Sequence, residues 1–201
     1  GFLPSLVGTA FDAGFAPGHV LLINAPGSTF YVDHVIFNGS GALKFYRGNS
    51  TINSGSGLLA GGSNPNGLAI AIDNTNTQGV SASSAVGAST ATTGAEMLIP
   101  WGDLGLPLAP AARAGQTVRL AAAIVRSAGD FGNQFLPPVP ADAGIAPNLG
   151  AIPGNQFVSV VLPHSGDFSG DGSVTVQDLF DFLGSWFLKA RAGDFNGDGT
   201  I

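Results

Sequence analysis

Short runs of β-branched and aromatic residues, separated by segments rich in glycine, serine and asparagine, most constrain the fold of this chain of 201 residues. The clearest run is 29–37, where Thr, Val, Ile, Phe and Tyr crowd together as in a half-buried strand. The intervening segments have the composition of turns and loops. Strands are expected at 19–24, 29–37, 42–47, 68–73, 95–100, 118–126 and 156–162. The pattern predicts a mainly β domain, an antiparallel β-sandwich, with one helical turn at 101–104.

The composition argues against several classes of protein. Only 7 residues are Lys or Arg and the net charge is −6, so the clustered cations that neutralise nucleic-acid phosphates are missing. No apolar run approaches the roughly 20 residues of a membrane-spanning helix, and no membrane span is expected. Cysteine is absent, which excludes disulfides, zinc thiolate sites and thiol nucleophiles from this stretch.

The character of the chain changes near its C-terminal end. Residues 164–201 carry six acidic and two basic side chains, whereas residues 1–163 are nearly balanced. This asymmetry predicts an acidic module with a cation partner, joined to a nearly neutral body. One helix is also expected here, because apolar residues recur at helical spacing. They are Val176, Leu179, Phe180, Leu183, Trp186 and Phe187.

A calcium-loop pattern stands directly before this helix. Counted from Asp167, side-chain oxygens occupy loop positions 1, 3, 5, 9 and 12, a backbone carbonyl is available at position 7, and Gly172 stands at position 6. This is the ligand order of an EF-hand loop. The expected ligands are Asp167, Ser169, Asp171, Ser173, Thr175 and Asp178. Position 12 is Asp rather than the usual Glu, which predicts a dissociation constant of about 10⁻⁴ to 10⁻³ M or somewhat lower.

The same block occurs twice. Residues 194–201 repeat residues 167–174, with Asn for Ser at position 3, Thr for Ser at position 7 and Ile for Val at position 8. A repeat of this kind predicts a second calcium loop. Its expected ligands are Asp194, Asn196, Asp198 and Thr200. The sequence reaches only position 8 of this loop, so the second repeat is expected to be truncated.

The duplicated loop, with Asp at position 12, a following helix and no entering helix, resembles the type I dockerin repeat. The resemblance implies a small calcium-folded module over 164–201 that attaches a secreted protein to a cohesin-like partner. It also implies that Asp181, Phe182, Ser185 and Lys189 form the exposed side of the helix. Val176 and Gln177 stand where dockerins carry the hydroxyl residues that contact cohesin.

The body over 1–163 carries a second resemblance. Residues 95–106 and 115–125 are similar to the strand, Pro-Trp, short-helix and strand stretch of family 9 carbohydrate-binding and DOMON-like sandwiches. The whole layout resembles secreted proteins of planctomycete-type bacteria that end in dockerin-like repeats. In those proteins the sandwich begins further upstream, which implies a front strand ahead of Gly1. The resemblance also implies an extracellular or cell-surface location.

The residues for catalysis are not recognisable in the sequence. Glycosidases need two carboxylates across a cleft, and the single Glu, Glu96, is expected to face solvent on a strand. His19, His34 and His164 fall in no metal-ligand spacing and are expected to be structural. Sugar binding requires only an exposed aromatic ring to stack on. The candidates are Tyr31, Tyr46 and Trp101, whereas Trp186 is expected to lie in the core of the calcium module.

Together these observations predict a secreted, non-catalytic, calcium-binding protein whose dockerin-like module mediates attachment or assembly. The expected partners are a cohesin-like protein, a polysaccharide or copies of the chain itself. Two alternatives stay open. The chain could be a carbohydrate-binding accessory fragment of a larger extracellular glycoside hydrolase, or a self-assembling extracellular filament subunit.

Overall fold

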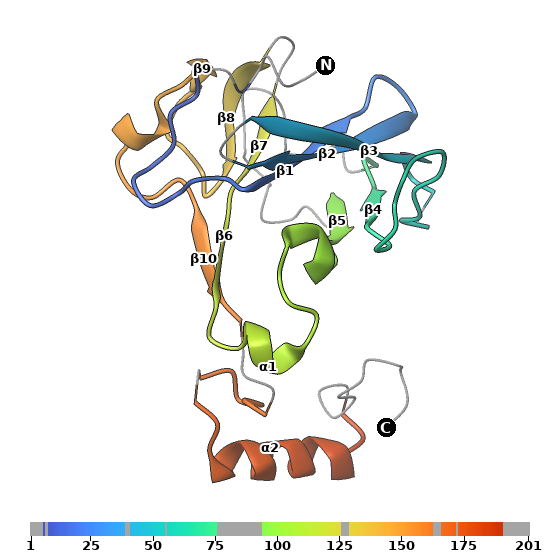
Figure 1. The fold of residues 1–201 in the computed structure, drawn as a ribbon, viewed down its shortest axis with the longest axis vertical. Coiled ribbons are helices and arrows are strands. Elements are labelled where there is room, and N and C mark those ends of the chain that lie inside the picture. The colour runs from blue at the N-terminus through green and yellow to red at the C-terminus, as the bar shows by residue number, and fades with distance from the viewer. Residues whose placement is uncertain are drawn as a thin grey trace. The chain divides into compact units, whose positions relative to one another are not determined.

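The computed structural model describes residues 6, 8–38, 41–54, 56–75, 94–125, 129–162, 166–171 and 173–190. The described residues are mainly β, with antiparallel pairing, as the sequence predicts (Figure 1). The strands are β1 (His19–Asn24), β2 (Thr29–Phe37), β3 (Ala42–Thr51), β4 (Ala69–Ile72), β5 (Ala95–Leu98), β6 (Thr117–Leu120), β7 (Ala122–Val125), β8 (Asp130–Leu136), β9 (Gly144–Ile145) and β10 (Val158–Val161). The helical segments are η3 (Trp101–Leu104), α1 (Pro110–Arg113), η5 (Leu149–Ala151) and α2 (Val176–Phe187).

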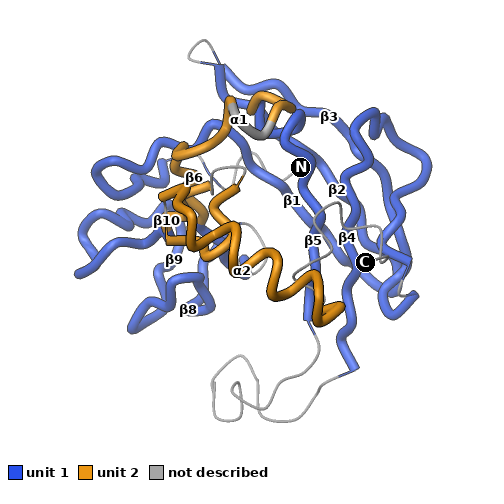
Figure 2. Tube along the Cα trace, turned by 90° about the horizontal axis from the view of Figure 1, so that it is seen from below, with its two compact units in different colours: residues 1–105, 121–158 blue, residues 106–120, 159–201 orange. Residues whose placement is uncertain are grey.

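Hydrogen bonding divides the described strands into four small sheets. Their orders are β1-β2-β3, β4-β5, β7-β8-β9 and β10-β6. The contacts between residues divide the chain into two compact units (Figure 2). One consists of residues 1–105 and 121–158, and the other of residues 106–120 and 159–201. The predicted domain boundary after residue 163 stays a prediction.

Several predicted elements are confirmed in detail. β1 and β2 begin and end at the expected residues, η3 occupies the expected helical turn, and α2 covers the expected helical stripe. The strand expected at 118–126 is wrong, because β6 and β7 are separate strands in different sheets. The break falls at Ala121, within an apolar run that contains no turn residue to mark it.

β8 and β9 were not expected from the sequence. β8 contains Gly132 and Asn133, residue types that are depleted in strands. Pairing with β7 overrides this weak local preference, with Ala123 opposite Phe135 and Val125 opposite Phe131.

The best-buried core of the first unit joins β2 to β4. Phe30 and Val32 of β2 are 0% exposed, and they cluster with Leu68 and Ile70. Burying apolar side chains of this size contributes roughly 1.5 to 3 kcal/mol each. Alternation along β2 sends His34 to the same face as Phe30 and Val32, while Tyr31 points to the other. His34 therefore lies on the same face of β2 as the apolar residues of the core.

Within the described residues, no helix is long and apolar enough to cross a membrane.

Candidate functional site

Asp167 organises the start of the predicted calcium loop. Its Oδ1 accepts hydrogen bonds from the backbone N–H groups of Gly170 (2.8 Å) and Asp171 (3.1 Å), and the residue is 8% exposed. Gly170 has a φ of 76°, a left-handed conformation that glycine adopts without strain. One carboxylate therefore closes a tight turn at loop positions 1 to 5.

Asp178 closes the other end of the loop from the first turn of α2. Thr175 is the N-cap, and its Oγ1 accepts from the N–H of Gln177 at 3.2 Å. The Oδ2 of Asp178 in turn accepts from the N–H of Thr175 at 2.7 Å and from its hydroxyl at 3.0 Å, which completes a capping box. Loop position 12 therefore turns its carboxylate back toward the loop.

Ser169 connects the two ends. Its backbone N–H donates to Oδ1 of Asp178 at 2.9 Å, and its hydroxyl lies 3.5 Å from Oδ1 of Asp167. The backbone hydrogen bonds from Ser169 and then Thr175 lower the pKa of Asp178 far below its ordinary value, because they favour the ionised carboxylate. Loop positions 1, 3 and 12 are thus gathered around the ionised carboxylate of Asp178.

The donor chemistry of this loop fits a hard cation, which prefers carboxylate, hydroxyl and carbonyl oxygens. Asp171 holds the next turn through its Oδ1, which accepts from the N–H of Ser173 at 2.8 Å. Among the described residues, however, no three His, Cys, Asp or Glu side chains are close enough together to hold a metal ion. Metal binding commonly draws such ligands together as it folds the site. Calcium binding therefore stays a prediction.

The second predicted loop cannot be placed in the same way. Asp194, Asn196, Asp198 and Thr200, like Gly172 of the first loop, lie outside the described residues.

The helix α2 turns a different side toward its loop than the sequence predicts. The ring of Phe168 packs edge-on against Phe182 at 5.7 Å between centroids, and Phe182 contacts Trp186 at 5.9 Å. Phe182 is half-buried rather than exposed, because closure of the loop at Asp167 carries its neighbour Phe168 against this side of the helix. Trp186, expected in the core, is 45% exposed. Four members of the predicted apolar stripe are more than half exposed, namely Val176, Leu179, Phe180 and Phe187.

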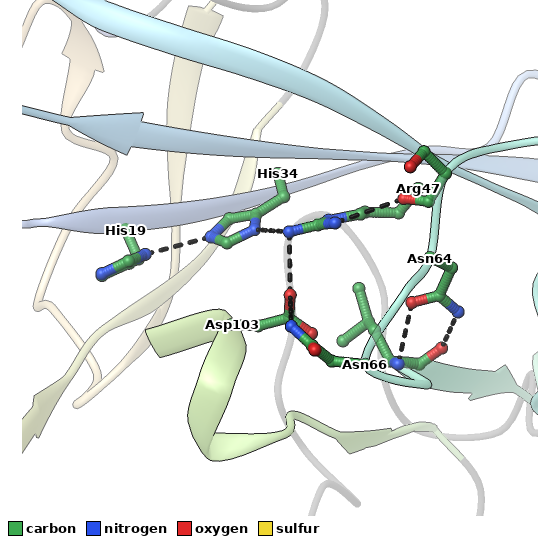
Figure 3. A network of polar contacts seen from close by, with 8 residues as sticks. His19, His34, Arg47, Asn64, Asn66 and Asp103 are labelled. Atoms are coloured by element: carbon green, nitrogen blue, oxygen red, sulfur yellow. Dashed lines mark hydrogen bonds and ion pairs between the residues drawn. The ribbon is translucent and has the colours of Figure 1, made fainter. Parts of the chain in front are cut away.

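A buried polar network is a second candidate site, and it lies wholly within the first unit (Figure 3). Nη2 of Arg47 donates to Oδ1 of Asp103 at 2.8 Å and lies 2.8 Å from Nδ1 of His34. The Nε2 of His34 lies 3.1 Å from Nδ1 of His19. Asn66 adds a hydrogen bond from Nδ2 to the same Oδ1 of Asp103 at 3.0 Å. His34, Arg47 and Asp103 are all less than 9% exposed.

Five different segments supply this network, and an irregularity in the sheet sets the direction of its central residue, Arg47. The register between β2 and β3 shifts at Val32 and Asp33, so that Arg47 has no partner residue on β2. Such a bulge changes the direction of a side chain, and here it directs Arg47 to the face of the sheet that carries His34. Sequence reasoning predicted His19 and His34 to be structural but missed Arg47 and Asp103, since neither the bulge nor a contact across 56 positions leaves a local signal.

The network disfavours the charged forms of both histidines. Burial lowers the pKa of His19, against a smaller opposing effect of Asp103. Burial is also the main cause that lowers the pKa of His34, and the positive charge of Arg47 adds to it. Both imidazoles are therefore neutral at pH 7.

Two of the three predicted stacking residues share a face of the β1-β2-β3 sheet. Tyr31 and Tyr46 are 42% and 37% exposed. Tyr31 pairs with Asn49 across β2 and β3, and Nδ2 of Asn49 donates to the hydroxyl of Tyr46 at 2.8 Å. On the same face Asp33 forms an ion pair of 2.7 Å with Lys44. The third residue, Trp101, is half-buried at the start of η3.

Glu96 is exposed on β5, as predicted for a strand residue facing solvent. The last histidine, His164, lies outside the described residues.

Comparisons with known protein families, with curated proteins and with solved structures find no match to this chain. The likenesses to dockerins and to family 9 sandwiches therefore rest on the residues quoted above.

Proposed function

We propose that residues 164–201 form a dockerin-like calcium module that anchors a secreted, non-catalytic β-sandwich protein to an extracellular or cell-surface partner. One observation carries the proposal. Ser169 contacts the carboxylates of both Asp167 and Asp178, so the first, third and twelfth positions of the loop already lie together. These are three of the positions at which an EF-hand loop supplies its oxygens.

The charge of the loop supports the same proposal. Asp167 and Asp178 are 8% and 2% exposed, and hydrogen bonds from Ser169 and Thr175 lower the pKa of Asp178. Both side chains are expected ligands, and a bound Ca²⁺ would be held by their carboxylate oxygens at the two ends of the loop. In this proposal the module folds fully in the calcium-rich medium outside the cell and then presents one helix face to a cohesin-like protein.

Calcium titration of the full chain tests the proposal. Calorimetry in buffer treated to remove calcium should show binding, and EDTA should lower the melting temperature of the C-terminal module. Asp171→Ala should abolish the binding at the first loop, because it removes the ligand at position 5. Asp181→Ala is the matched control, since Asp181 lies on α2 outside the loop, where its Oδ1 accepts a hydrogen bond from Nε2 of Gln177 at 2.8 Å. A chain that binds no calcium, or Asp171→Ala and Asp181→Ala with equal affinities, would refute the proposal.

A second candidate function is polysaccharide binding by the sheet face that carries Tyr31 and Tyr46. Two exposed rings can stack on pyranose faces, and Asn49 with the tyrosine hydroxyls can hydrogen-bond to sugar hydroxyls. The pairing of Lys44 with Asp33 leaves this face without net charge, which favours a neutral polysaccharide. Polysaccharide binding by this face also fits the alternative that the chain is an accessory part of a larger glycoside hydrolase.

Retention on insoluble polysaccharides distinguishes this function from self-assembly. Pull-down of the full chain by cellulose, xylan or chitin should decrease in Tyr31→Ala and Tyr46→Ala. Phe45→Ala is the control, because Phe45 is a comparably exposed ring (40%) on the opposite face of β3. Concentration-dependent oligomers without polysaccharide retention would instead support a filament subunit.

A further inference from the structure

The polar network of the first unit has a defined order of donors and acceptors. A guanidinium has only donors, so the Nδ1 of His34 that faces Arg47 at 2.8 Å must accept. Neutral His34 then carries its proton on Nε2 and donates it to Nδ1 of His19. His19 in turn carries its proton on Nε2. The hydrogen bonds therefore run in one direction from Arg47 through His34 to His19, while Arg47 also holds Asp103.

We propose that His19, His34, Arg47 and Asp103 form an acid-sensitive latch, which holds η3 on the β1-β2-β3 sheet at neutral pH and releases it in mild acid. Asp103 is the member that belongs to η3, and the other three come one from each strand of the sheet. The latch concerns the first unit alone and is independent of the proposed calcium module.

Protonation of His34 is incompatible with the arrangement. A proton on Nδ1 removes the lone pair that accepts from Arg47, and it places two cations 2.8 Å apart at a residue that is 1% exposed. A proton on His19 similarly removes the acceptor for His34. Among the described residues, the charged groups that face the histidines are Arg47 and Asp103. The carboxylate of Asp103 is already paired with Arg47. The Lys44–Asp33 pair lies on the opposite face of the sheet.

The pH range of the latch follows from the sign of the shifts. The pKa of each histidine is lowered by burial from the ordinary value of 6.5, so the unfolded chain binds protons more readily than the folded one. The stabilisation that the two neutral histidines contribute is therefore complete above about pH 6.5 and decreases as the pH falls below this value. Between pH 7.5 and 5.0 each histidine can reduce the ratio of folded to unfolded chain by at most about 30-fold.

The direct measurement is a pair of NMR titrations of the full chain in EDTA, in which the imidazole signals of His19 and His34 should titrate below 6.5. Amide hydrogen exchange, corrected for its intrinsic pH dependence, should show Asp103 and Gly105 losing protection between pH 7.5 and 5.0. These amides bond to the carbonyls of Pro100 and Gly102 and so report on η3 itself.

Three variants separate the latch from general acid sensitivity. His34→Asn should exchange at η3 equally at both pH values, because its amide oxygen can accept from Arg47 but cannot be protonated in this range. His19→Gln gives a second, milder test in case His34→Asn does not fold. His164→Gln removes the third histidine of the chain and should behave as the wild type. Imidazoles that titrate at or above 6.5, or pH-dependent exchange that persists in both network variants, would overturn the proposal.

Discussion

Arg47 and Asp103 form a buried ion pair of 2.8 Å between Nη2 and Oδ1, although 56 positions separate them in the chain. Nε of Arg47 and Oδ2 of Asp103 are buried and have no hydrogen-bond partner among the described residues. Each charge is therefore compensated mainly by the other. The pair connects β3 to η3 and is the basis for the first prediction.

Asp103→Asn should destabilise the chain by about 3 to 5 kcal/mol, because it leaves the guanidinium of Arg47 buried without a counter-charge. Urea denaturation at pH 7.5 measures the change. Asp33→Asn is the control, since its ion pair with Lys44 is partly solvent-exposed, at 25% and 39% for the two side chains, and should contribute less than about 1 kcal/mol. Equal losses in the two variants would contradict the prediction.

Gly62→Ala should also destabilise the first unit, by about 1 to 3 kcal/mol. A Cβ at residue 62 would lie 2.4 Å from the backbone carbon of Arg47 and from the nitrogen of Gly48, and neither backbone atom can move without disturbing β3. The melting temperature measures this effect. Gly27→Ala has nothing within 4 Å of its new Cβ and should leave the melting temperature nearly unchanged.

Thr175→Ala should shorten or destabilise α2 by about 1 kcal/mol, since it removes the oxygen that caps the N–H of Gln177. Thr175→Ser keeps a capping hydroxyl and should retain the helix. Far-UV circular dichroism during thermal unfolding compares the two. Indistinguishable unfolding curves for the Ala and Ser variants would show that the cap does not stabilise α2.

Acid should weaken the loop and the start of α2 through Asp178. Hydrogen bonds from Ser169 and Thr175 lower its pKa below the ordinary value of 3.8, so the unfolded chain protonates first. The stabilisation is therefore complete above about pH 4 and decreases as the pH falls below it. NMR of the Ser169 and Thr175 amides between pH 6 and 2 measures the loss. Asp178→Asn should remove most of this pH dependence, and Asp181→Asn should leave it intact.

The local sequence determined much of the secondary structure. β-branched and aromatic residues between turn residues predict β1 and β2 to the residue, because strand propensity and chain-breaking residues act within a few positions. The start of α2 is equally local, since Thr175 and Asp178 cap it over three residues. The turn closed by Asp167 likewise needs only its own loop.

Tertiary structure decided what these elements bring together. β8 forms against the preference of Gly132 and Asn133 because β7 pairs with it. The side of α2 that packs is set by Phe168, which loop closure carries to Phe182, and not by the spacing of apolar residues alone. Arg47 reaches Asp103 only through a bulge in β3 and a turn of η3 far along the chain. Two buried charges attract each other because they are close in space, however far apart they lie in the sequence. Local sequence patterns therefore could not reveal this network.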